Sequence, residues 1–165
     1  MSDTVGEKAT LLDYLGHYRE VIERKCEDLD AGQLATRSVP PSSLSLLGLV
    51  RHLAKVERDW FPRTLAERPE TPRLYWTEAD PELAFTGAVA DDAVVAEAFA
   101  TWRQEVASAD AWLADLPEAD LGREVPHRDG PVSVRDVLVH LIEEYARHAG
   151  HADLLRECLD GRTGE

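Results

Sequence analysis

Apolar residues recur at intervals of three and four positions in four segments of the chain, the period typical of amphipathic helices. We predict the first helix over residues 8–29, followed by a polar turn at 30–32. The second is predicted to begin near Ser42 and Ser43, which suit an N-terminal cap, and to run to Phe61, where Pro62 should kink or end it.

The third helix is predicted over residues 91–113, and the fourth over 133–160. Ser133 and Asp136 have the spacing of a capping box, and Gly161 suits a helix end. No segment shows convincing strand alternation. The predicted fold class is therefore all-α, a four-helix bundle.

Residues 69–90 form a long connection between helices two and three. This segment has three prolines, one glycine and no sustained period, yet it carries Tyr75, Trp76 and Phe85. Such a connection is more often a crossover packed on the bundle, or a flap over a site, than a free linker. We treat it as a candidate substrate lid, whereas residues 118–131 should form a polar loop.

Composition narrows the class of protein. A chain of 165 residues with 44% hydrophobic content suits a single domain, residues 1–165, with one core. Its net charge of −14, without a basic stripe, argues against nucleic acid as a partner. The polar N-terminal stretch and the lack of any long apolar run predict no membrane contact and a cytoplasmic location. We expect Cys26 and Cys158 to be reduced, buried and non-nucleophilic.

The candidate chemistry lies near the end of the chain, where His140, Glu144, His148 and His151 are spaced by four, four and three residues. At about 100° per residue they share one face of the fourth helix. Glu144 and His148 fall within the inward apolar stripe, and a buried carboxylate is costly unless it is paired or binds a metal. His52, beside the apolar stripe of helix two, is the obvious ligand from a facing helix.

One imidazole from helix two, with a carboxylate and an imidazole from helix four, could supply three ligands to a divalent metal and leave a position for water or substrate. A glutamate four residues before a histidine is also a frequent pair on helix surfaces. Spacing alone therefore leaves both interpretations open.

Two segments carry a resemblance to a known family: LVRHLAKVERDWF at residues 49–61 and LVHLIEEYARHAGHADLLRE at 138–157. They resemble the DinB/YfiT-like superfamily of metal-binding four-helix bundles, in particular its DUF664 branch, related to the N-terminal domain of mycothiol-dependent maleylpyruvate isomerase. The resemblance implies a DinB-like bundle with its long connection between helices two and three. It also implies that His52, Glu144 and His148 bind a divalent metal, zinc or nickel.

The resemblance further implies an activity. Many DinB-like proteins have histidine where this chain has Glu144. Glutamate is a harder ligand than histidine and adds one negative charge, so the identity of the metal stays open. Maleylpyruvate isomerases have an additional C-terminal domain, so their isomerisation is not the expected reaction. We expect transfer of mycothiol, bacillithiol or a similar small thiol, activated on the metal, to a small electrophile. The alternatives are a metal-dependent hydrolase that uses bound water and a non-catalytic metal-binding stress protein; a homodimer is implied by resemblance only.

The remaining polar and aromatic residues have less specific interpretations. We expect His140 at an exposed or core-edge position, with a role beside the ligands as the alternative, and we consider His151 as a hydrogen-bond partner of a ligand. His17 is a candidate for the edge of the same cavity. Arg51 and Arg147 should lie on a solvated helix face, or else meet an anionic substrate. Packing is the first interpretation for five aromatic residues: Trp60, Tyr75, Trp76, Trp102 and Trp112.

Overall fold

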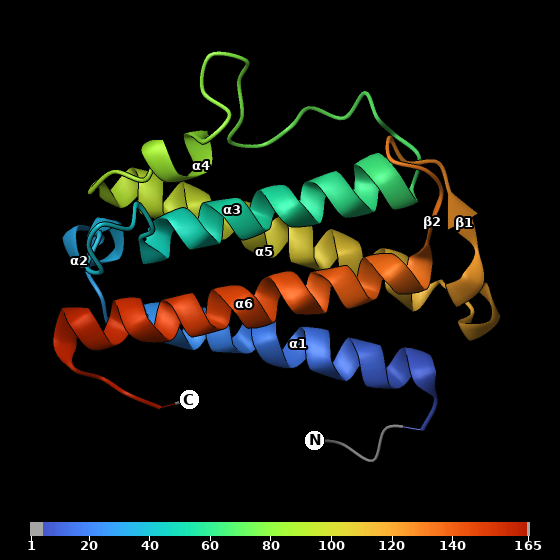
Figure 1. The fold of residues 1–165 in the computed structure, drawn as a ribbon, viewed down its shortest axis with the longest axis horizontal. Helices are drawn as coiled ribbons and strands as arrows, with labels where there is room; N and C mark the ends of the chain where they lie inside the picture. The colour runs from blue at the N-terminus through green and yellow to red at the C-terminus, as the bar shows by residue number, and fades with distance from the viewer. Residues whose placement is uncertain (1–4, 165) are drawn as a thin grey trace.

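The computed structural model describes residues 5–164, so the first four residues of the polar N-terminal stretch lie outside it. It confirms an all-α bundle with four long helices (Figure 1). These are α1 (Glu7–Cys26), α3 (Leu46–Arg58), α5 (Asp92–Ala114) and α6 (Val134–Asp160). Shorter elements are α2 (Ala31–Ala35), a π-helical segment (Asp59–Leu65), α4 (Leu83–Thr86), a 3-10 turn (Glu118–Gly122), β1 (Glu124–Val125) and β2 (Val132–Ser133). None of the helices within 5–164 is long and apolar enough to cross a membrane.

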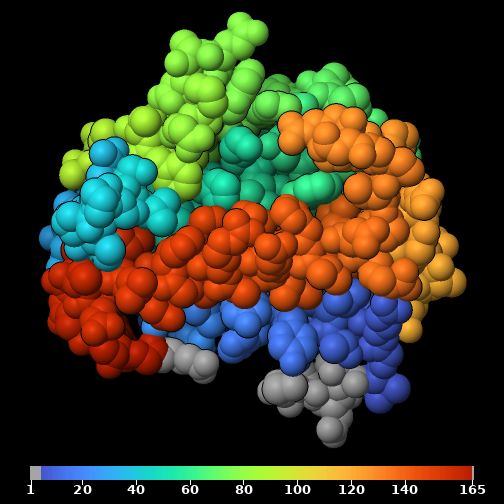
Figure 2. All heavy atoms as spheres, in the orientation of Figure 1, coloured from blue at the N-terminus to red at the C-terminus, as the bar shows by residue number. Residues whose placement is uncertain are grey.

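The bundle is built from two helix pairs. α1 packs mainly against α6, and α3 packs mainly against α5, while α3 and α6 lie side by side at the front of Figure 1. α3 and α5 run in the same direction, so the chain must return along the bundle between them. The connection at 69–90 makes this return, and Figure 2 shows it in green above α3. The predicted crossover is thus packed on the bundle, and it places α4 against α3.

The last two long helices have nearly the predicted bounds. Asp91 caps α5, because its side chain accepts hydrogen bonds from the backbone amides of Ala93 and Val94. Ser133 and Asp136 form the predicted capping box at the start of α6. Gly161 ends α6 in the left-handed conformation, with φ of 76°, which glycine adopts without steric cost.

The first two predicted helices needed correction. The first ends at Cys26, and the expected polar turn instead starts α2, because Asp30 forms a capping box with Gln33. The second starts later than predicted, since Ser45 Oγ, and not Ser42 or Ser43, accepts the capping hydrogen bond.

Pro62 does not end the second helix. The chain continues beyond Arg58 as the π-helical segment, with Pro62 inside it. The predicted polar loop at 118–131 also contains regular structure, because β1 pairs with β2 in a short antiparallel hairpin. Both features lie at the same end of the bundle (Figure 1).

Candidate metal centre

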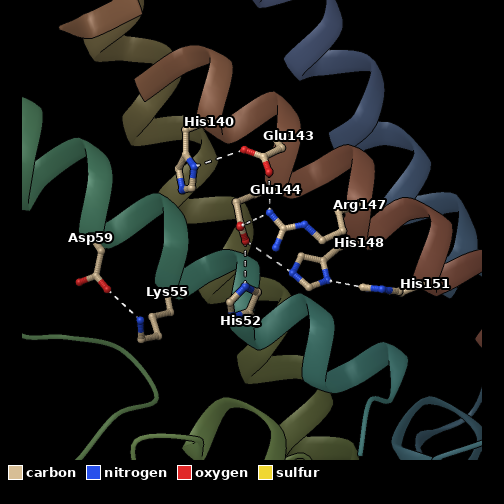
Figure 3. A network of polar contacts seen from close by, with 9 residues as sticks. All are labelled: His52, Lys55, Asp59, His140, Glu143, Glu144, Arg147, His148 and His151. Atoms are coloured by element: carbon tan, nitrogen blue, oxygen red, sulfur yellow. Dashed lines mark hydrogen bonds and ion pairs between the residues drawn. The ribbon is translucent and has the colours of Figure 1, made fainter. Parts of the chain in front are cut away.

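α3 and α6 bring three potential ligands together between them. His52 comes from α3, and Glu144 and His148 come from successive turns of α6 (Figure 3). Glu144 Oε2 lies 3.3 Å from His52 Nε2 and 3.5 Å from His148 Nε2. One ligand atom from each residue lies within 4.8 Å of the others. The sequence prediction that these residues meet is confirmed, while their role as metal ligands remains a prediction.

The three side chains are largely but not fully buried. Their exposed fractions are 23% for His52, 12% for Glu144 and 9% for His148. Burying the Glu144 carboxylate here would cost free energy if it had no partners. Small molecules from solvent can still approach the centre from the side of His52, the most exposed of the three. The centre is therefore partly desolvated and accessible.

Glu144 is held in its ionised form. Hydrogen bonds with His148 and His52, and the nearby charge of Arg147, keep its pKa well below the ordinary value, although burial acts in the opposite direction. Arg147 Nη2 donates to Glu144 Oε1 at 2.9 Å, which leaves Oε2 facing the two imidazoles. Arg147 is exposed, as predicted for a solvated helix face, and it pairs with both Glu143 and Glu144.

His151 orients the buried histidine of the centre. Its Nδ1 lies 3.2 Å from Nδ1 of His148. Burial and the charges of His148 and Arg147 lower the pKa of His151, so a neutral ring can accept a hydrogen bond there. The contact with His151 limits rotation of the His148 ring, as partners on the second ring nitrogen do for metal-binding histidines. The predicted contact between His151 and a candidate ligand is confirmed.

The long connection covers the other side of His52. Phe85 of α4 stacks on the His52 ring, with centroids 5.4 Å apart. Gly48 permits this approach, because a Cβ at that position would lie only 2.9 Å from Phe85 Cδ1. The sequence marked Phe85 as one of three aromatic residues in a candidate lid, but no periodicity within the connection fixes which of them reaches α3.

Arg51 fastens the same connection and does not lie on a solvated face, so that prediction was wrong. It is buried and donates hydrogen bonds to the carbonyl oxygens of Ala84 and Leu83. Its guanidinium also lies 4.0 Å from the centre of the Tyr75 ring. Arg51 therefore holds the connection against α3 through these contacts.

The donor set fits a divalent metal ion. Ligand bonds of about 2.0–2.2 Å place two donors of a tetrahedral site about 3.4 Å apart, close to the two separations from Glu144 Oε2. Two imidazoles and one carboxylate suit zinc and nickel alike, so the donors do not choose between them.

The other predicted residues lie outside the triad. His140 is near Glu143 and Trp60 at the edge of the core, as expected. His17 is exposed on α1 with its ring against Tyr18, and no contact places it beside the triad. Trp102 is buried, in agreement with a packing role.

The two cysteines differ from one another. Cys26 is buried as predicted, and burial raises the pKa of its thiol to about 12. Cys158 is exposed, which corrects the expectation that both are buried: it lies on the outer face of the last turn of α6. Neither belongs to the triad.

Comparisons with known proteins identify the fold and the family. No curated protein matches the chain. Among solved structures, a conserved protein from Enterococcus faecalis shares the fold, with a TM-score of 0.65 and 17% sequence identity over 96% of this chain and 100% of that one. The model of the family described as Mycothiol-S-transferase matches residues 10–161, which include most of α1, the whole of α3, α5 and α6, and the triad. The chain therefore belongs to the Mycothiol-S-transferase family.

Proposed function

We propose that this protein is a divalent-metal-dependent thiol S-transferase that joins mycothiol to a small electrophile. The observation that carries the proposal is the convergence of His52, Glu144 and His148 in a chain of the Mycothiol-S-transferase family. A divalent ion held there would lower the pKa of a coordinating thiol, so that the thiol is nucleophilic near neutral pH.

The protein's own groups prepare this site. Glu144 contributes a negative charge: hydrogen bonds with His148 and His52, together with the charge of Arg147, lower its pKa, and Arg147 orients the carboxylate. His151 fixes the ring of His148, and Phe85 fixes the ring of His52. These contacts reduce the reorganisation that binding a cation and a thiol would otherwise require.

The test is thiol transfer by purified protein loaded with zinc or with nickel. Mycothiol and a panel of electrophiles are supplied, and conjugates are measured by mass spectrometry beside a protein-free reaction. We expect conjugation that requires both metal and thiol, that is lost in His148→Ala, and that persists in the matched variant His140→Ala. Turnover without any thiol would instead favour a hydrolase, and metal binding without turnover would favour a non-catalytic binding protein.

A further inference from the structure

A second chemical feature lies beside the candidate metal centre. It is a hollow of about 420 Å³ between the end of α3, the start of the long connection and the loop that joins β1 to β2. In Figure 2 the surface of α3 is recessed between this orange loop, the green connection and α6. The hollow is lined by Lys55, Asp59, Trp60, Arg63, Thr64, Pro69, Arg73, Pro126, His127 and Arg128.

The hollow is positively charged in a strongly acidic protein. Four of its lining residues are lysine or arginine, and its one carboxylate is Asp59, whereas the whole chain has a net charge of −14. The sequence showed no basic stripe, because three separate segments of the chain contribute these cations. Only the fold brings them to one place.

The existing ion pairs do not neutralise this charge. Lys55 and Arg63 share Asp59, at 3.0 Å and 3.1 Å, so two cations face one anion in the inner part of the hollow. Arg73 lies over the Trp76 ring, 4.8 Å from its centre, and no acidic partner of Arg73 is found among residues 5–164. Arg128 at the rim is paired with its neighbour Asp129. An excess of positive charge therefore remains for a bound anion.

One wall of the hollow is aromatic. Trp60 stacks on His127, with ring centroids 5.3 Å apart and planes inclined by 21°. Trp60, Asp59 and Arg63 all belong to the π-helical segment, a rare conformation that is frequent at functional sites. The hollow thus combines a flat apolar surface with cations, as a binding site for a small organic anion requires.

The hollow and the candidate metal centre are one helical turn apart. Lys55 follows His52 by three residues on α3, a spacing that places the two Cβ atoms about 5–6 Å apart. Figure 3 shows Lys55 of α3 and the adjoining Asp59 near His52, outside the seam between α3 and α6 in which Glu144 and His148 lie. A molecule with its anionic end in the hollow can therefore present its other end at the centre.

We infer that this hollow binds the carboxylate or phosphate group of the electrophilic substrate and so selects small anionic acceptors. This inference rests on the proposed function for the identity of the ligand. Mycothiol carries hydroxyl, amide and thiol groups but no carboxylate or phosphate, so the anionic group belongs to the acceptor. Lys55, Arg63 and Arg73 bind that group, and Trp60 packs against the carbon skeleton.

Binding is tested first without turnover. Succinate and inorganic phosphate serve as probes in calorimetric titrations of zinc-loaded protein at low salt, and their comparison distinguishes carboxylate from phosphate. We expect Lys55→Gln and Arg73→Gln each to weaken binding about tenfold with metal content unchanged. The control Arg103→Gln removes an exposed arginine that pairs with Glu23 on another face, and it should bind normally.

Probe binding by a variant that lacks one candidate metal ligand tests whether the anion binds in the hollow or on the metal. His148→Ala should still bind the probe, because the hollow does not use the metal. Loss of binding in His148→Ala would place the anion on the metal and overturn the inference. The inference would also be overturned if neither probe binds, or if Lys55→Gln and Arg73→Gln bind the probes as tightly as the unchanged protein does.

Kinetics then test selectivity. The acceptors are N-ethylmaleimide and its carboxylate-bearing analogue 3-maleimidopropionic acid. Arg73→Gln should raise KM about tenfold for the acid alone, with kcat unchanged. Arg73→Lys, which keeps the positive charge, should restore most of the lost affinity for the acid. An equal effect on both acceptors would contradict selection by charge. If neither acceptor is conjugated but succinate binding still requires Arg73, the proposed function fails and the anion site stands. If conjugation occurs but succinate binding does not require Arg73, only this inference fails.

Discussion

At the scale of single residues, the candidate metal centre depends most on Glu144. Its carboxylate contacts both histidines of the triad and Arg147, and it is the only negatively charged member of the triad. Glu144→Gln keeps the shape of the side chain but removes the charge. We expect zinc or nickel affinity to fall about 10- to 100-fold or more, measured by titration against a competing chelator.

Glu143→Gln is the matched control for this substitution. Glu143 is the neighbouring glutamate, exposed on the same turn of α6, and it also pairs with Arg147. It should leave metal affinity close to that of the unchanged protein, and circular dichroism should report the same helix content for both variants. Equal affinities for Glu144→Gln and the parent protein would remove Glu144 from the ligand set.

The two thiols provide a second prediction at this scale. With its pKa raised to about 12 by burial, Cys26 stays protonated and shielded in the folded protein, whereas Cys158 is exposed. We expect one thiol to react rapidly with Ellman's reagent at pH 8 and the second only after denaturation. Because the pKa of Cys26 is higher in the folded than in the unfolded chain, its contribution to stability is complete below about pH 9 and declines as the pH rises towards 12.

Mass spectrometry after native labelling assigns the reactive thiol. Modification should lie on Cys158, and Cys158→Ser should abolish the rapid phase. Rapid labelling of Cys26 in the native protein would show that this part of the core opens readily.

The sequence predicted the triad because its spacing is set by local geometry. Residues four apart on one helix necessarily share a face, so Glu144 and His148 could be paired before any fold was known. His52 required a second helix to face them, and its place beside an apolar stripe made that a reasonable prediction. Phe85 and Arg73 could not be found in this way, because the connection has no sustained period, and the four residues of α4 are too few to show one.

At the scale of elements, the long connection acts as a cover that α3 holds in place through Arg51. We expect Arg51→Met, which keeps the aliphatic stem but removes the donors to the Ala84 and Leu83 carbonyls, to loosen this cover. Amides of residues 83–89 should exchange with solvent at least about tenfold faster in hydrogen-exchange mass spectrometry. Exchange in α1 should not change.

Arg103→Gln again provides the control, since it removes an exposed arginine of α5 that pairs with Glu23 of α1. It should leave exchange in residues 83–89 unaltered. Unchanged exchange in Arg51→Met would mean that packing of α4, and not Arg51, holds the cover.

Element boundaries show where local signals are sufficient. The caps of α6 were predicted because Ser133, Asp136 and Gly161 act through their immediate neighbours in the chain. The start of α3 was misplaced because three serines lie within four positions of one another, and tertiary packing decides which of them caps. The π-helical segment was not foreseen, since Pro62 argued only for a kink or an end.

At the scale of the whole molecule, one buried polar network joins the four long helices. Arg19 of α1 forms two hydrogen bonds of 2.9 Å with Glu57 of α3. Tyr145 of α6 donates to Glu57 at 2.7 Å and accepts from Trp102 of α5 at 2.9 Å. Glu57 and Tyr145 are fully buried, so each of these groups depends on its partners for solvation.

This network involves residues next to the candidate metal centre on both α3 and α6. Tyr145 follows Glu144 on α6, and Glu57 lies on α3 between His52 and the hollow's Asp59. The bonds therefore fix the separation of α3 and α6 on which the geometry of the triad depends. Amphipathic periodicity predicted the bundle, but it could not predict this network, because the pairing of buried polar groups depends on how the helices are arranged around one another.

Tyr145→Phe tests the contribution of the network to the bundle. The substitution preserves the ring but leaves Trp102 Nε1 without its acceptor and Glu57 without one donor, all within the core. An unsatisfied buried polar group costs about 1–3 kcal/mol, so we expect the free energy of unfolding in urea to fall by about that amount, with an unchanged m-value. Tyr14→Phe, at an exposed position of α1, should have little effect. An unchanged midpoint for Tyr145→Phe would mean that the hydroxyl contributes nothing to stability, and that apolar packing alone sets the separation of the helices.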